Sequence, residues 1–121
     1  MEINVLNWLD KVKKFSACSN KVYYPEIDAY ICSHCGKIFD GVNVIWTYDH
    51  YLPASLNGMT NADNLFPLCK SCNSERGDVL VNGLEYYKYI TAEARENMIH
   101  SISHKKVMDM LEKQGKFNKN S

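Results

Sequence analysis

Asp49, His50 and Asn73 are the residues of this sequence whose types and spacing could do chemistry. Asp49 and His50 are adjacent at the exit of an apolar run, and Asn73 directly follows a Cys-x-x-Cys pair. A carboxylate and an amide oxygen are hard ligands, which suit Mg²⁺ or Mn²⁺ and suit zinc poorly. A histidine with an ordinary pKa of about 6.5 can be neutral and take a proton from water. These are the groups that metal-assisted hydrolysis of a phosphodiester bond requires.

A second set of residues predicts a structural metal site. The chain has five cysteines, of which four form two Cys-x-x-Cys pairs, Cys32 with Cys35 and Cys69 with Cys72. In a reducing compartment, two such pairs separated by a long insert predict tetrahedral zinc rather than disulfides. Gly36 permits the sharp backbone turn that the first pair needs. Cys18 is left over, and we interpret it as an ordinary small buried or half-buried residue.

A hairpin and a helix are the elements that must position these residues. Residues 42–48 are rich in β-branched and aromatic residues with period-two spacing, which predicts a strand that delivers Asp49 and His50 at its end. Residues 51–63 have a turn-forming composition and predict a compact loop. Residues 64–68 predict a strand that returns antiparallel to the first, with Pro67 at an edge. Residues 70–76 then predict a two-turn helix that is stopped by Gly77.

Asn64 opens the expected return strand and therefore faces the end of the first strand. A catalytic histidine needs one ring nitrogen held while the other takes the proton. We expect Asn64 to brace either His50 or the loop around it. The first cysteine pair, Cys32 and Cys35, forms a knuckle that precedes the hairpin. The zinc site would connect this cysteine knuckle to the helix that carries Asn73.

The order of these motifs resembles the HNH endonuclease family over about residues 30–78. The resemblance rests on Asp49-His50 with Pro53 three residues later, on Asn64, and on Asn73 after the second cysteine pair. It implies that Asp49 and Asn73 bind a catalytic divalent metal, that His50 is the general base and that Asn64 is structural. It places the sequence with the His-Asn-Asn variants that also carry four zinc-binding cysteines.

Two positions depart from the family's usual pattern. The loop has Asn57-Gly58 where the family often shows a pair of glycines, and Arg76 stands where many members carry lysine before the final glycine. Neither position is one of the expected catalytic groups. The implied fold is α+β, a ββα-metal core with a structural zinc knuckle, flanked by N-terminal and C-terminal helices. We expect one domain over residues 1–121, with helical extensions over 1–29 and 79–121.

The flanking segments show helical patterns. Apolar residues at helical spacing predict an amphipathic helix over residues 3–15, a short helix over 83–90 whose aromatic residues belong to the core, and a long helix from the N-cap Thr91 to about Gln114. His34, inside the first cysteine pair, is expected to be a polar surface residue. His100 and His104 lie one turn apart without a third ligand nearby, which favours a solvated face.

Composition limits the classes of partner. The 14 basic side chains balance 14 acidic ones, so binding to nucleic acid must come from local basic patches. No run approaches the roughly 18 apolar residues of a membrane span, and the start lacks a secretory pattern, so we expect a cytoplasmic protein without a membrane partner. A dimer or a larger assembly stays open.

The sequence is compatible with two functions. The first is a DNA endonuclease that uses catalytic Mg²⁺ or Mn²⁺ and structural zinc, of the sort found in phage, mobile-element and restriction settings, with RNA open as a substrate. The second is a non-catalytic zinc module that binds nucleic acid or a protein partner. Asp49, His50 and Asn73 favour the first, because a binding module has no need of a base beside two oxygen ligands.

Overall fold

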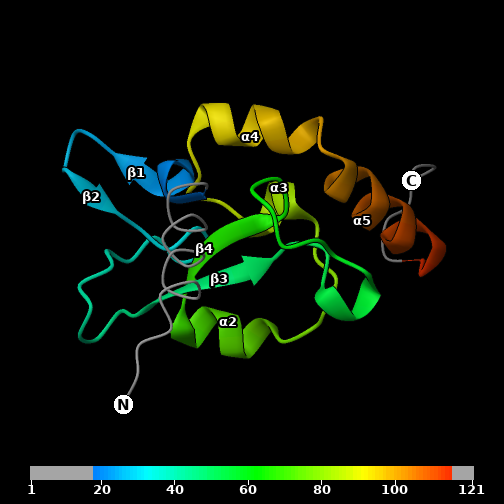
Figure 1. Cartoon of the computed structure of the whole chain (residues 1–121), viewed down its shortest axis with the longest axis horizontal. Helices are drawn as coiled ribbons and strands as arrows, with labels where there is room; N and C mark the ends of the chain where they lie inside the picture. Colours follow the sequence, from blue (N-terminus) through cyan, green and yellow to red (C-terminus); the bar gives the residue numbers. More distant parts are fainter. Residues whose placement is uncertain (1–17, 116–121) are drawn as a thin grey trace, which may run out of the picture.

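The centre of the protein is an antiparallel hairpin packed on one helix. The computed structural model describes residues 18–115, and the predicted helix over residues 3–15 lies outside this range. Strand β3 (Trp46–His50) pairs with β4 (Leu65–Cys69), from Trp46 opposite Cys69 to His50 opposite Leu65. Helix α2 (Lys70–Arg76) follows β4 directly and lies along the hairpin (Figure 1). The predicted α+β class with a ββα core is confirmed.

The first strand begins later than its residue pattern indicates. The Oδ1 atom of Asp40 accepts hydrogen bonds from the backbone N–H groups of Val42, Asn43 and Val44 at 2.8–2.9 Å. These bonds turn the backbone at Val42 and Val44, which are β-branched but lie in a loop, and Val42 is 76% exposed. The strand therefore starts at Trp46 and includes Asp49 and His50 as its last residues.

Strand β4 is buried along its whole length, and it joins the hairpin to the cysteine knuckle. Each of its five residues is buried. Pro67 sits opposite Tyr48, and its carbonyl oxygen accepts hydrogen bonds from the backbone N–H and the hydroxyl of Ser33, at 3.0 and 2.6 Å. A proline is tolerated here because Pro67 contacts the knuckle through its carbonyl group, so its missing N–H is not needed for this contact.

A small N-terminal unit precedes the core. It consists of the 3-10 helix η1 (Ser19–Val22) and the antiparallel strands β1 (Tyr23–Tyr24) and β2 (Ala29–Tyr30). Its aromatic side chains continue onto β3, since the ring of Tyr30 lies 5.8 Å from that of Trp46. This contact fixes the unit against the strand that carries Asp49 and His50.

The C-terminal helices cover the hairpin from the side opposite to α2 (Figure 1). They are α3 (Gly83–Tyr86), α4 (Ala92–Ile99) and α5 (Ile102–Lys113). Thr91 caps α4 as predicted, its side chain accepting a hydrogen bond from the N–H of Ala94 at 3.1 Å. The predicted continuous helix is wrong, because Ser101 interrupts it and caps α5 by accepting a hydrogen bond from the N–H of His104.

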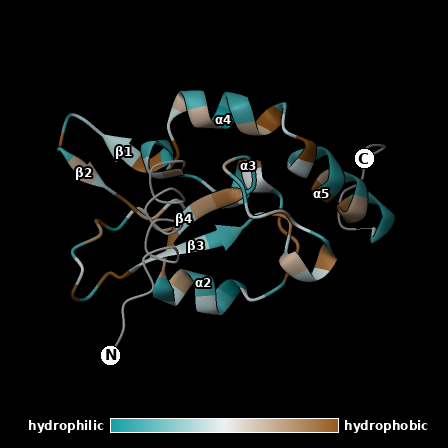
Figure 2. Ribbon diagram, in the orientation of Figure 1, coloured by the Kyte–Doolittle hydropathy of each residue, from teal (hydrophilic) through white to brown (hydrophobic). Residues whose placement is uncertain are grey.

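An aromatic core joins the hairpin to these helices. The rings of Phe66 and Tyr87 stack with centroids 4.2 Å apart, and Tyr51 meets both rings edge to face. Figure 2 shows apolar colouring along β4, which lies between α2 and α4, whereas the end of β3 is coloured hydrophilic. Tyr87 is fully buried, as predicted for the aromatic residues of this segment, whereas Tyr89 is 43% exposed.

Among residues 18–115, no helix is both long and apolar enough to cross a membrane.

Candidate functional site

The four paired cysteines form one cluster. The Sγ atoms of Cys32, Cys35, Cys69 and Cys72 all lie within 4.8 Å of one another, and those of Cys35 and Cys69 are 3.9 Å apart. In a tetrahedral zinc site with Zn–S bonds of about 2.3 Å, neighbouring sulfur atoms lie about 3.8 Å apart. The cluster therefore has the ligands and the spacing for zinc, as predicted from the sequence.

Local backbone geometry builds the cysteine knuckle. Gly36 has a φ of +77° and donates its N–H to the Cys32 carbonyl at 2.9 Å. A Cβ atom at this position would also lie 3.0 Å from the ring of Tyr89, which would have to shift slightly, so the positive φ is the main reason for glycine here. The N–H of Cys69 points at the Cys32 sulfur, 3.3 Å away. The knuckle thus faces the end of β4, where the second cysteine pair begins.

His34 lies outside the sulfur cluster. Its ring stacks on the ring of Tyr86 with centroids 4.0 Å apart, and its Nδ1 atom lies 2.9 Å from the Tyr86 carbonyl oxygen. The side chain is half-buried. His34 therefore links the knuckle to α3. From the sequence we expected only a polar surface residue at this position.

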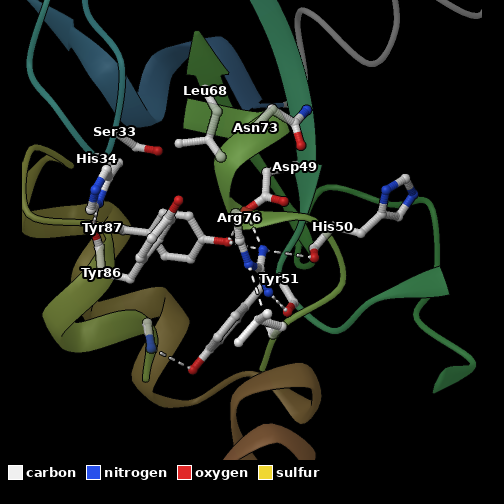
Figure 3. A network of polar contacts seen from close by, with 12 residues as sticks. Ser33, His34, Asp49, His50, Tyr51, Leu68, Asn73, Arg76, Tyr86 and Tyr87 are labelled. Carbon is white, nitrogen blue, oxygen red and sulfur yellow. Dashed lines mark hydrogen bonds and ion pairs between the residues drawn. The ribbon is translucent and has the colours of Figure 1, made fainter. Parts of the chain in front are cut away.

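Asp49 is buried at the end of β3 and pairs with two residues from other elements. It is 4% exposed. Its Oδ2 atom forms an ion pair with Arg76 and accepts a hydrogen bond from the hydroxyl of Tyr87 at 2.5 Å (Figure 3). Burial raises the pKa of the Asp49 carboxyl, while the charge of Arg76 and the hydroxyl of Tyr87 act in the opposite direction. Both of these contacts use Oδ2, which leaves Oδ1 for a further ligand.

Arg76 fixes the end of β3 through its guanidinium group. Besides Asp49, it donates to the carbonyl oxygen of His50 at 3.1 Å and to that of Tyr51 at 2.7 Å. Its Nε atom donates to the Val79 carbonyl at 3.2 Å. A single side chain from α2 therefore contacts three consecutive residues of the strand end. The rigid, five-donor guanidinium makes this arrangement possible.

His50 projects from the other face of β3. Successive residues of a strand point to opposite faces, and Figure 3 shows the His50 ring directed away from the Asp49 and Arg76 cluster. The ring is half-buried, and its Nε2 atom lies 2.9 Å from the hydroxyl oxygen of Thr60. An accessible imidazole with one ring nitrogen held is suited to proton transfer.

Asn64 is fully buried and bonds the loop between the two strands. Its Oδ1 accepts from the N–H of Leu52 at 2.7 Å, and its Nδ2 donates to the carbonyl groups of Leu52 and Met59, both at 2.9 Å. Of the two expected partners, His50 or the loop around it, these bonds reach the loop. A single amide thereby joins the two ends of the loop that flanks His50.

Asn73 is oriented by the strand next to it. Its Nδ2 atom donates to the Thr47 hydroxyl at 2.9 Å and to the Tyr48 carbonyl at 3.2 Å. Figure 3 shows the amide with its oxygen on the Asp49 side. A carboxylate oxygen and an amide oxygen are both hard donors, of the kind that Mg²⁺ and Mn²⁺ prefer.

Lys21 supports the same loop from the N-terminal unit. Its Nζ atom donates to the carbonyl oxygens of Ala62 and Leu65, the latter at 2.7 Å, and it lies 4.0 Å above the Phe66 ring. Burial lowers the pKa of Lys21 to about 8. This contact was not predicted, because nothing local in the sequence pairs Lys21 with a loop more than 40 residues away.

The two C-terminal histidines differ from each other, and the prediction of a shared solvated face is wrong for His104. His104 is 8% exposed, and its Nδ1 atom lies 2.6 Å from the Tyr51 hydroxyl. His100 is exposed and pairs with Glu96, one turn earlier in α4. The cause is the helix break at Ser101, which turns α5 so that His104 faces the core.

Comparison with known protein families finds a match for the central part of the chain. Residues 32–78 match the family model described as HNH endonuclease. This segment is less than half of the chain, and it is similar to the HNH endonuclease family over the β3–β4 hairpin, α2 and the cysteine cluster. At the level of the family, the match indicates a nuclease that acts on nucleic acid. No curated protein and no solved structure matches the chain.

Proposed function

We propose that this protein is a metal-dependent DNA endonuclease that hydrolyses phosphodiester bonds, with His50 as the general base and one catalytic divalent metal. The observation that supports it most is the end of β3, where an accessible imidazole and a buried carboxylate leave the strand on opposite faces. In in-line hydrolysis the attacking water and the departing oxygen lie on opposite sides of phosphorus, so a base and a metal ligand that approach the phosphate from different directions suit this reaction.

Asp49 and Asn73 are the residues that would hold Mg²⁺ or Mn²⁺. Asp49 would offer Oδ1, because Oδ2 bonds to Arg76 and Tyr87. Asn73 would offer its amide oxygen, because its nitrogen bonds to Thr47 and Tyr48. A metal ion bound there would neutralise charge that develops on the phosphate.

Arg76 and Asn64 would position the catalytic groups without reacting themselves. Arg76 holds Asp49 and the carbonyl groups of His50 and Tyr51, so that the base and the carboxylate keep a fixed separation. Asn64 closes the loop beside the base. Fixed geometry of this kind is valuable because displacing a reacting group by about 1 Å can cost about 100-fold in rate.

A plasmid assay tests this proposal. Supercoiled DNA is incubated with the protein in Mg²⁺, in Mn²⁺, and in a chelator, and nicked and linear forms are followed by gel. We expect cleavage with either metal and none with the chelator, which should leave the circular dichroism spectrum intact because zinc held by four thiolates is released slowly. His50→Ala should remove cleavage and retain the fold, whereas His100→Ala, at an exposed histidine away from the hairpin, should cleave like the wild type.

The same assay decides between the two functions. Wild-type protein that binds DNA but leaves the plasmid supercoiled in both metals would support the non-catalytic zinc module. Cleavage by His50→Ala at the wild-type rate would place the base elsewhere. A labelled RNA of the same sequence, assayed in parallel, separates DNA from RNA as the substrate.

A further inference from the structure

The loop between β3 and β4 brings one hydroxyl to the expected catalytic base. The Nε2 atom of His50 and the Oγ1 atom of Thr60 lie 2.9 Å apart. Thr60 follows η2 (Ala54–Leu56) in the loop and is ten residues from His50 in sequence. The contact uses a side chain that neither the cysteine cluster nor the carboxylate network contains.

The loop around Thr60 is held by bonds that keep this hydroxyl in place. Asn64 donates to the carbonyl group of Met59, the residue directly before Thr60, at 2.9 Å. Gly58 donates to the Pro53 carbonyl at 3.0 Å, and a Cβ atom at Gly58 would lie 1.7 Å from the Leu52 carbonyl oxygen. The loop closes tightly only because this residue is glycine. Thr60 is therefore presented to His50 by a fixed backbone.

The direction of the hydrogen bond determines which ring nitrogen can act. A neutral imidazole has one N–H donor and one acceptor nitrogen, and a hydroxyl can serve either of them. If Thr60 donated to Nε2, the ring proton would lie on Nδ1, and neither nitrogen would be free to take a proton from water. If Thr60 accepts from Nε2–H, then Nδ1 carries no proton and is free to act as the base.

We infer that Thr60 is a positioning residue for His50, whose hydroxyl oxygen accepts the Nε2–H bond and so holds the ring in the form with an unprotonated Nδ1. This inference rests on the proposed function of His50 as the general base. Thr60, rather than Asn64, is then the residue that holds the His50 ring directly. Asn64 then acts on His50 through the loop, by fixing the residue before Thr60.

Three variants test the assignment. Thr60→Val keeps the shape of the side chain and removes the hydroxyl, Thr60→Ser keeps the hydroxyl, and Ser55→Ala removes another exposed hydroxyl of the same loop. We expect Thr60→Val to lower kcat for plasmid nicking by about 10- to 100-fold, by analogy with the loss found when a group that orients a metal-bound histidine is removed. KM should change little, Thr60→Ser should recover most of the rate, and Ser55→Ala should match the wild type.

The ring nitrogens of His50 give a readout that does not depend on cleavage. Nitrogen-15 NMR shifts at a pH where the ring is neutral should show the proton mainly on Nε2 in the wild type and in Thr60→Ser, and a more even distribution in Thr60→Val. The same distribution in Thr60→Val and the wild type overturns the role of Thr60, even if the protein cuts DNA. A wild-type protein that cuts no nucleic acid overturns the nuclease proposal, and the catalytic role of Thr60 with it.

Discussion

The side chain of Asp49 has two roles, one in the stability of the fold and one in the proposed chemistry. Its Oδ2 atom stabilises the fold by pairing with Arg76 and Tyr87, while its Oδ1 atom is the proposed metal ligand. Burying a charged pair costs desolvation energy, which the pair recovers only while both partners are present. A change at Asp49 should therefore affect folding as well as chemistry.

We expect Asp49→Ala to lower the free energy of unfolding by about 3–5 kcal/mol, because it leaves the Arg76 guanidinium buried without its counter-ion. It should also weaken Mn²⁺ binding and abolish cleavage. Urea unfolding and calorimetry with Mn²⁺ measure the two effects. Glu96→Ala, which removes the carboxylate of the exposed pair with His100, is the control and should change neither quantity appreciably. Unchanged Mn²⁺ affinity in Asp49→Ala would assign the metal ligand to another residue.

His104 gives the stability a dependence on pH. Burial lowers the pKa of His104 below its ordinary value of 6.5, so the unfolded chain binds a proton more readily than the folded one. The stability contributed by neutral His104 is complete above about pH 6.5 and declines as the pH falls toward the folded-state pKa. Gly83 donates its N–H to the Tyr51 hydroxyl, which leaves the hydroxyl hydrogen for Nδ1 of neutral His104.

We expect the melting temperature to fall less between pH 7.5 and 5.5 in His104→Gln than in the wild type, although His104→Gln should be less stable at pH 7.5. Thermal unfolding followed by circular dichroism across this range is the measurement. An identical pH dependence in the two proteins would show that His104 does not titrate with folding.

Helix α2 is the element on which the site depends, and its bounds were predictable. It carries Cys72, Asn73 and Arg76, and it ends at Gly77, whose φ is +57°. The cysteine pair before it and the glycine after it are local signals, so residues 70–76 could be predicted from sequence alone. Local signals also gave the cysteine cluster and the Thr91 cap.

Other features depend on contacts that no local pattern encodes. The start of β3 was misplaced because Val42 and Val44 fit a strand pattern, while the turn is made by the side chain of Asp40. Asp49 meets Arg76 and Tyr87 across 27 and 38 residues of sequence. Such partners are determined by packing of distant elements, so their roles could not be predicted from residue spacing.

We expect Cys72→Ser to lose zinc, fold and cleavage together. Structural zinc sites contribute binding free energy on the order of 10 kcal/mol to folding, and this one connects α2 with the knuckle. Elemental analysis, circular dichroism and plasmid cleavage measure the three properties. Cys18→Ala, at a buried cysteine outside the cluster, should keep its zinc. Folded, active Cys72→Ser protein would contradict a structural role for the metal.

The charge of the whole molecule is balanced, with 14 basic and 14 acidic side chains. Attraction to a polyanion must then come from local patches, since the net field is weak. Lys105 and Lys106 are adjacent and exposed on α5. They form one cationic position from which the C-terminal helix could contact a phosphate backbone.

We expect Lys105→Gln with Lys106→Gln to weaken DNA binding most at low salt and to reduce the slope of log affinity against log salt by about 2, if both contact phosphates. Fluorescence anisotropy with a labelled duplex at several salt concentrations gives the slope. An unchanged slope would show that these lysines lie on a solvated face away from the DNA.

The aromatic core has a consequence for dissecting the protein. Tyr87, which bonds Asp49, and His104, which bonds Tyr51, both lie beyond residue 78, where the family match ends. A fragment cut at that boundary would expose the Phe66 ring and leave the Asp49 and Arg76 pair partly uncovered. We therefore expect the matched segment not to fold as an autonomous module. Transplanting it into another protein, or expressing it as a minimal nuclease, would require its C-terminal helices to be carried along or replaced by a surrogate that fills the same space.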